Sequence, residues 1–200
     1  MRGFAASLLV AVALMLFAVA VPSSAMAAEP AVKYRSDYDE YFRKYSKRFF
    51  GVNKDWRWFK AQAIAESNLE STARSAVAAK GVMQIMPNTF VELQKKNPEF
   101  ENIDDPRWNI AAGIYYDSTL WRRYEALSDD QQRRNFMFGA YNAGPATMTR
   151  ARQLAESAGH DSTQWSSVIA VAPKVPSWRH KETLRYIDRI QGVFAALQGF

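Results

Sequence analysis

The spacing of apolar residues along the chain predicts helices and no convincing strand. No stretch alternates apolar and polar residues for long enough to form a half-buried strand. Apolar residues three and four positions apart favour helices instead, as in the C-terminal stripe of Ile187, Ile190, Phe194 and Leu197. The predicted helices cover residues 36–50, 56–67, 89–96, 106–124, 133–141, 145–158 and a stretch around 187–197. We therefore expect a mainly α protein with little or no β-sheet.

Residues that cap helices precede several of these stretches. Asp55 stands before an aromatic and apolar run, and Asp105 is followed by proline, which suits the first helical position. Two further pairs have the spacing of a capping box: Thr89 with Glu92, and Ser128 with Gln131. No internal repeat or long linker divides the chain. We expect a helical extension over residues 28–54 and one helical domain over residues 55–200.

The N-terminal stretch has the pattern of an export signal. Arg2 gives a positive start, an apolar run covers residues 8–21, and Pro22 breaks it before the small residues Ala25 and Ala27. A membrane-spanning helix needs about 20 apolar residues, so a cleaved signal peptide over residues 1–27 is favoured over a retained anchor. Without cysteine, the chain cannot carry a lipid anchor on a cysteine. We expect an exported, periplasmic or cell-envelope protein with no permanent membrane anchor.

Composition narrows the chemistry that the chain can perform. Apolar residues make up 48% and charged residues 23%, which is typical of a globular protein. The absence of cysteine excludes disulfides, thiolate metal sites and a cysteine nucleophile, and the two histidines nearly exclude a histidine metal centre. We expect neither a metal nor a cofactor. The net charge of +6 indicates an anionic partner without naming it.

Glu66 is the candidate for acid chemistry. It continues a helical stripe that includes Phe59 and Ala63, and it lies close to the expected end of that helix. Burial and the negative end of the helix dipole both disfavour its charge, so its pKa should rise towards the range of a general acid. A solvated glutamate in a fraying last turn is the alternative that this pattern alone allows. Glu70 has the same spacing but lies beyond the expected helix end, so we assign it to the surface.

The sequence around Glu66 resembles a known family. The motifs are Glu66-Ser67, Gly81-Val82-Met83-Gln84, Asn109 to Gly113, Tyr141-Asn142-Ala143-Gly144 and Glu182-Thr183 with Tyr186-Ile187. In their order and spacing they are similar to the catalytic domain of soluble-type lytic transglycosylases, relatives of goose-type lysozyme that cleave bacterial peptidoglycan. The resemblance covers roughly residues 55–192. It implies a lysozyme-like fold.

The resemblance also implies roles for individual residues. Glu66 matches the catalytic acid and base of the family. The matched substrate-binding positions are Ser75, Gln84, Met86, Tyr141, Asn142 and Tyr186. Of these, Tyr141 is also a plausible hydrogen-bond donor to the Glu66 carboxyl, because a phenol donates without competing for the proton at neutral pH. Val82, Ala76, Ala78 and Lys80 depart from the usual family residues on the loop flank and leave fine substrate preference open.

A single carboxylate is compatible with cleavage of an N-acetylated glycan. Most glycosidases use two carboxylates, but no clear second one is found here. Asp105 is a helix cap, Asp117 has the spacing of a helical surface residue, and Asp104 has no distinguishing feature. The substrate's acetamide oxygen can stabilise the positive charge at the anomeric carbon instead. The family's reaction would then be cleavage between N-acetylmuramic acid and N-acetylglucosamine with formation of a 1,6-anhydromuramyl end.

Other functions remain open from the sequence. A hydrolase of the lysozyme type could use the same acid, with water in place of the sugar hydroxyl. A non-catalytic envelope scaffold of the same fold is a second alternative, and protein partners in envelope machinery are possible. Nucleic-acid binding is disfavoured because the basic residues are dispersed among 20 acidic ones. The anionic glycan strands of peptidoglycan account for the positive charge more simply.

Overall fold

The computed structural model describes residues 36–198, so the predicted signal peptide lies outside the described residues. Apart from one short 3₁₀ turn, η1 (Ala172–Lys174), the regular elements of this part are α-helices. They are α2 (Asp39–Phe50), α3 (Arg57–Ser67), α4 (Pro87–Gln94), α5 (Pro106–Arg123), α6 (Asp130–Ala143), α7 (Pro145–Ser157), α8 (Trp165–Val171) and α9 (His180–Gln198). Between residues 36 and 198 there is no strand, only two isolated bridges, which join Lys80 to Arg74 and to Ile85. The prediction of a mainly α fold is confirmed.

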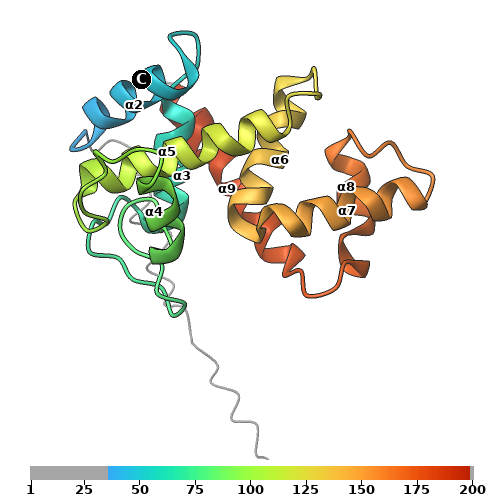
Figure 1. Cartoon of the computed structure of the whole chain (residues 1–200). Helices are drawn as coiled ribbons and strands as arrows, with labels where there is room; N and C mark the ends of the chain where they lie inside the picture. The colour runs from blue at the N-terminus through green and yellow to red at the C-terminus, as the bar shows by residue number, and fades with distance from the viewer. Residues whose placement is uncertain (1–35, 199–200) are drawn as a thin grey trace, which may run out of the picture.

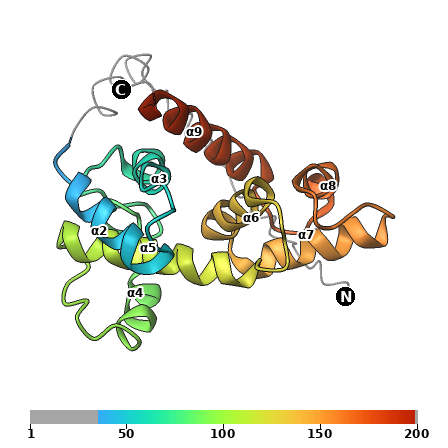
Figure 2. The same cartoon turned by 90° about the horizontal axis from the view of Figure 1, so that it is seen from above.

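The helices form two groups joined by α6 and α9. Figure 1 shows α2, α3, α4 and α5 on one side and α7 with α8 on the other. Seen from above, α9 runs diagonally past α3 towards α6 and α8 (Figure 2). The most extensive helix contacts are those of α9 with α3 and of α2 with α5. Helix α9 therefore carries its residues past both the end of α3 and the end of α6.

Periodicity explains how α9 packs. Ile187, Ile190, Phe194 and Leu197 are all buried, as their spacing predicted. They face α3 and α6, the two helices that α9 contacts most. Trp58 of α3 stacks on Phe194 with ring centroids 3.5 Å apart. The stripe therefore fixes the position of α9 against the helix that ends at Glu66.

Helix α2 belongs to the same core as the helices that follow it. Phe42 and Tyr45 are buried, and α2 packs on both α5 and α3. Phe49 lies against Tyr115 of α5 with ring centroids 5.1 Å apart. The helix predicted within residues 28–54 thus lies in direct contact with the domain. No described helix between residues 36 and 198 is long and apolar enough to cross a membrane.

The predicted helix starts are right at two places and wrong at two others. The carboxylates of Asp55 and Asp105 accept hydrogen bonds from backbone N–H groups two residues on, at 3.0 and 2.8 Å. The capping box at Thr89 is wrong, because α4 already begins at Pro87, whose missing N–H suits the first helical position. The capping box at Ser128 is also wrong. Asp129 caps α6 by accepting from the backbone N–H of Gln132 at 2.8 Å.

Candidate active site

Glu66 is the penultimate residue of α3. The helix ends because Asn68 adopts a left-handed conformation with φ of 54°, and its backbone N–H bonds to the Ile64 carbonyl. The hydroxyl of Ser67 donates to the Val82 carbonyl at 2.8 Å, which ties the helix end to the loop before α4. Glu66 is therefore held in a fixed last turn and not in a fraying one.

The environment of the Glu66 carboxyl favours its protonated form. The residue is only partly exposed, and removal of the carboxyl from water raises its pKa from 4.5 to about 7. A hydrogen bond from Tyr186 and the positive charge of Arg189 oppose this rise without cancelling it. A carboxylic acid with a pKa near 7 is about half protonated at neutral pH, which suits a group that must both give and take a proton.

The tyrosine that contacts Glu66 is Tyr186 and not Tyr141. The Tyr186 hydroxyl donates to Glu66 Oε1 at 2.6 Å. The Tyr141 hydroxyl instead donates to the Met83 carbonyl at 2.7 Å, so its only proton is used there. The expectation that Tyr141 donates to Glu66 is wrong, because a backbone carbonyl of the neighbouring loop takes its proton. The three side chains are nevertheless close, since the charge of Glu66 raises the pKa of both tyrosines, second to their burial.

The loop before α4 is clamped onto α5 by Asn109. The Asn109 side chain accepts from the Met83 backbone N–H at 2.8 Å and donates to the carbonyls of Lys80 and Ile103. Gly81 has a φ of +74°, and a Cβ there would lie 2.6 Å from Asn109 Nδ2. Gly113 of α5 lies against Met83 in the same way, with a virtual Cβ 2.7 Å from that side chain. Two of the motifs noted in the sequence therefore form one clamp.

Three predicted binding residues lie on this loop. The Ser75 hydroxyl accepts from the Ala79 backbone N–H at 3.0 Å, and within residues 36–198 no hydrogen bond joins it to Glu66. The Gln84 amide donates to the carbonyls of Gly81 and Ala73, at 2.9 and 3.3 Å, so its donors hold the loop. Met86 is 41% exposed. Met86 is thus an exposed thioether on the loop, and the Gln84 side chain is hydrogen-bonded to the backbone of the same loop.

A chain of hydrogen bonds orients Asn142 at the end of α6. The buried indole of Trp178 donates to the Thr183 hydroxyl at 2.9 Å, and that hydroxyl donates to Asn142 Oδ1 at 2.8 Å. Asn142 itself is exposed, so its Nδ2 group stays accessible. Thr183 and Tyr186 are three residues apart on α9. One helix therefore holds both the Glu66 carboxyl and the Asn142 amide.

Asp117 is buried, contrary to the expectation from its spacing. It is wholly inaccessible, and Gln62 Nε2 donates to its Oδ1 at 3.3 Å. Burial raises its pKa well above the ordinary value, and the charge of Glu66 raises it further. Within residues 36–198, Asp117 Oδ2 and Gln62 Oε1 have no hydrogen-bond donor. A protonated Asp117 would supply a donor among these groups, so we assign it as neutral.

The position of Asp117 on α5 carries a sequence signal for its burial. Asp117 follows buried Ile110, Gly113 and Ile114 at intervals of seven, four and three residues, which are the positions of the buried face of α5. Gln62 precedes Glu66 by one helical turn on α3. Asp104, the third acid considered, is exposed and pairs with Arg74 and Lys80. Of the acids considered, Glu66 and Asp117 are therefore the ones relevant to the candidate active site.

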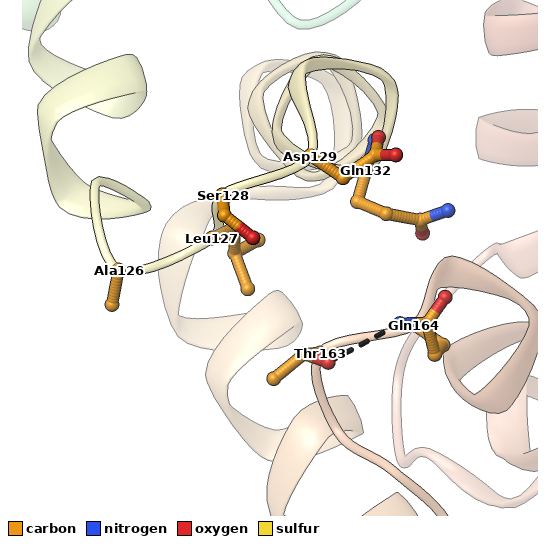
Figure 3. Close-up of a pocket in the computed structure, with 7 residues that line it drawn as sticks. All are labelled: Ala126, Leu127, Ser128, Asp129, Gln132, Thr163 and Gln164. Atoms are coloured by element: carbon orange, nitrogen blue, oxygen red, sulfur yellow. Dashed lines mark hydrogen bonds between the residues drawn. The ribbon is translucent and has the colours of Figure 1, made fainter.

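A small cavity lies away from these residues. It has a volume of about 110 Å³ and is formed between the loop before α6 and the turn before α8. Figure 3 shows Ser128, Asp129 and Gln132 on one side of it and Thr163 with Gln164 on the other. None of the predicted site residues lines this cavity. In the described part of the chain, no group of three or more potential metal ligands comes together.

Comparisons with known proteins agree with this arrangement. A family model described as "Transglycosylase SLT domain" matches residues 40–163. The chain belongs to this family. The match begins within α2.

Relatives and solved structures support the same assignment. Proteins named "Membrane-bound lytic murein transglycosylase F" from Desulfosudis oleivorans and Maricaulis maris are each 30% identical, over 68% and 66% of this chain. The 70 kDa soluble lytic transglycosylase of Escherichia coli superposes with a TM-score of 0.61 at 26% identity, over 82% of this chain and 24% of its own. The Slt lytic transglycosylase of Pseudomonas aeruginosa, at 24% identity and a TM-score of 0.62, supports the fold. This chain spans about 31% and 28% of the two curated relatives.

Proposed function

We propose that this SLT domain is a peptidoglycan lytic transglycosylase in which Glu66 is the general acid and base. The observation that carries the proposal is the Glu66 carboxyl, whose pKa is raised to about 7 by burial and which Tyr186 holds at 2.6 Å. The names of the relatives support the substrate class. The small share of those relatives that this chain spans makes the activity a proposal for this protein.

Glu66 would act twice in one turnover. The protonated carboxyl gives its proton to the oxygen that bridges N-acetylmuramic acid and N-acetylglucosamine, and the bond from that oxygen to the anomeric carbon breaks. The acetamide oxygen of the muramyl residue stabilises the positive charge that develops there. The muramyl C6 hydroxyl oxygen then bonds to the anomeric carbon, and its proton returns to Glu66. The ring closes as a 1,6-anhydro end, and the acid is regenerated.

The surrounding residues suit these two steps. Tyr186 orients one carboxylate oxygen and stabilises the anion that exists between the steps. Asn142, Met86 and the loop of Ser75 and Gln84 are the proposed glycan-binding groups. Asn142 is exposed and its amide is oriented by Thr183, so its Nδ2 donors can meet an acetamide carbonyl or a hydroxyl of the glycan.

We also propose that the protein works in the cell envelope. The predicted export signal of residues 1–27 supports this location, as do the relatives named as membrane-bound. Association with protein partners of the envelope stays a prediction.

Digestion of purified cell-wall sacculi tests the activity and the residue together. The wild-type protein should release soluble muropeptides that are one water lighter than hydrolytic products. Glu66→Gln keeps the shape of the side chain but cannot deliver a proton, so it should stay folded and release almost nothing. Products that carry the full mass of a reducing end would indicate a hydrolase of the lysozyme type. Undiminished release by Glu66→Gln would refute the role of this residue.

A further inference from the structure

The solvent face of α2 is strongly basic. Arg43, Lys44, Lys47 and Arg48 are all exposed, and their spacing of one, four and five residues places them on one side of the helix. Asp37 and Glu40 are exposed acids that precede them in the chain. The opposite side of α2 packs into the core through Phe42 and Tyr45. The helix is thus anchored on one face and positively charged on the other.

Most of this charge is not neutralised by carboxylates. Arg48 pairs with Glu99. Within residues 36–198, Arg43, Lys44 and Lys47 take part in no ion pair, and the Arg43 guanidinium lies 4.4 Å from the centre of the Trp56 ring. Charges that stabilise the fold would be paired with opposite charges within the protein. The unpaired charges are available to an external anion.

The turn after α2 adds an exposed apolar side chain to this charge. Val52 follows Gly51, whose φ of +88° ends the helix, and it is 75% exposed. A groove of about 320 Å³ runs beside it, lined by Arg43, Lys47, Lys54 and Trp56 together with the residues of the turn. Lys54 is fixed there, with its ammonium 3.7 Å from the centre of the Trp121 ring. Val52 is therefore an exposed aliphatic side chain with basic and aromatic side chains around it.

This surface and the Glu66 carboxyl lie at opposite ends of α3. Trp56 precedes the first residue of α3, and Glu66 is near its last. At a rise of 1.5 Å per residue, the helix separates the two by about 15 Å along its axis. A partner bound at Arg43, Lys47 and Val52 would leave the Glu66 end of the helix uncovered.

We propose that the basic face of α2 and the Val52 turn form a peripheral docking site for an anionic phospholipid surface. The lysines and arginines would meet lipid phosphates, and Val52 would enter the boundary between headgroups and acyl chains. A wall polymer would use the same charges but has no apolar layer to receive Val52, which is why the bilayer is the favoured partner. The proposal does not depend on catalysis, so it goes beyond the proposed function.

Vesicle binding by the full chain tests this site. Wild-type protein should partition more strongly to vesicles that contain phosphatidylglycerol than to vesicles of phosphatidylcholine alone, and the ratio should fall as salt is added. The variant Lys44→Gln/Lys47→Gln should lower that ratio by about tenfold or more, because each basic residue near an anionic surface adds to membrane affinity. Val52→Asp should lower binding to the anionic vesicles as well. Because every variant retains residues 1–35, their contribution cancels in the comparison.

A matched variant controls for net charge. Lys174→Gln/Lys181→Gln removes two exposed lysines, one in η1 and one in the first turn of α9, neither of which belongs to α2 or lines the groove, and should leave the ratio unchanged. If the proposed function is right, both double variants should release muropeptides from lipid-free sacculi like the wild type. Loss of activity alone would not contradict the proposed docking site. The proposal is overturned if the Lys44/Lys47 variant keeps the wild-type ratio. It is also overturned if the control variant loses as much, or if the Lys44/Lys47 variant loses affinity for sacculi and not for vesicles.

Discussion

The side chain of Tyr186 controls the proton affinity of Glu66. A hydroxyl that donates to a carboxylate stabilises the charged form and so lowers the carboxyl pKa. Burial raises the pKa of Glu66 to about 7 in spite of this bond. The pKa of Glu66 therefore reflects burial, which raises it, against the Tyr186 hydrogen bond and the Arg189 charge, which lower it. The hydrogen bond can be removed by a single substitution.

Tyr186→Phe should move the alkaline limb of the activity profile to higher pH. In the proposed mechanism the active form has a protonated Glu66, so activity should decline as pH rises through about 7 in the wild type. A hydrogen bond to a charged group contributes about 1.5–3 kcal/mol, so its loss should shift the limb upward by about one pH unit or more. The measurement is kcat/KM against pH on soluble glycan fragments. Tyr141→Phe is the control, because its hydroxyl bonds to Met83 and its loss should leave the limb in place.

Buried acids at positions 66 and 117 should also make the protein less stable as pH rises. Each pKa is raised in the folded state, so the native protein binds more protons than the unfolded chain above about pH 4. The free energy of unfolding must then fall with rising pH. For Glu66 the window runs from 4.5 to about 7, which amounts to about 3 kcal/mol above pH 7.

Asp117→Asn should therefore unfold at a higher temperature than the wild type at neutral pH. The amide keeps the shape and removes the group that resists ionisation, and the advantage should shrink as pH falls towards about 4 and be absent below it, where the acid is protonated in both the folded and the unfolded state. Thermal unfolding followed at several pH values checks this. Asp117→Asn should still release muropeptides, in contrast to Glu66→Gln. A wild-type melting temperature at every pH would contradict the assignment of Asp117 as a neutral buried acid.

Sequence reasoning at the level of single residues was right about the caps Asp55 and Asp105 and wrong about Thr89 and Ser128. Glu66 was singled out by its stripe and its place near a helix end, but only the motifs around it favoured a catalytic role over a solvated glutamate. The structure buries its carboxyl. Asp117 was missed because an acid was assumed to be solvated, although its spacing from Ile110 placed it on the buried face. Which of two tyrosines reaches Glu66 depends on how α6 and α9 pack, which local patterns do not contain.

At the scale of elements, the clamp between the loop and α5 determines where the binding residues lie. Gly81 and Asn109 are 28 positions apart and yet in contact, since a Cβ on Gly81 would lie 2.6 Å from Asn109 Nδ2. The Asn109 side chain cannot rotate easily, because it is hydrogen-bonded to the backbone of Lys80, Met83 and Ile103. The loop therefore has little room to adjust.

Gly81→Ala should destabilise the protein by about 2–4 kcal/mol, from the left-handed φ and from overpacking against Asn109. Gly159→Ala is a matched control, because Gly159 has a φ of +79° but nothing within 4 Å of a virtual Cβ. It should cost only about 1–2 kcal/mol for the backbone conformation. Denaturant unfolding of both variants measures the difference. Equal losses would show that the contact with Asn109 is unimportant.

Thr183 offers a test of the element that orients Asn142. Thr183→Val keeps the shape but removes the bonds to Trp178 and Asn142, so KM should rise about 5–10-fold, the value of one hydrogen bond, with kcat little changed. Thr183→Ser should restore the wild-type KM. In an Asn142→Ala background the Thr183→Val change should have no further effect on KM. A fall in kcat alone would place Thr183 in a different role.

Every described α-helix except α8 was predicted from the sequence, and the helix boundaries were predicted less well. The long, strongly periodic helices α5 and α9 follow their apolar patterns closely. The starts of α4 and α6 were misplaced by two and three residues, because Pro87 and Asp129, close to the predicted caps, provide better starts. Short-range chemistry therefore decides between neighbouring cap positions that a spacing rule cannot separate.

On the scale of the whole molecule, α9 joins both helix groups. It packs on α3 near Glu66 and on α6 near Asn142, so one helix sets the distance between the acid and a proposed glycan-binding residue. The sequence indicated that these parts belong together only through the family resemblance. Their relative placement comes from long-range packing between helices far apart in the chain.

The burial of the Glu66 and Asp117 carboxyl groups has a consequence for efforts to engineer this protein. A laboratory library screened for heat resistance alone should enrich replacements at positions 66 and 117, since each removes an ionisable group from the interior. The winners at position 117 would be useful catalysts, and those at position 66 would be robust but inert. A screen for stable variants of this protein therefore has to measure catalytic activity as well as thermal stability.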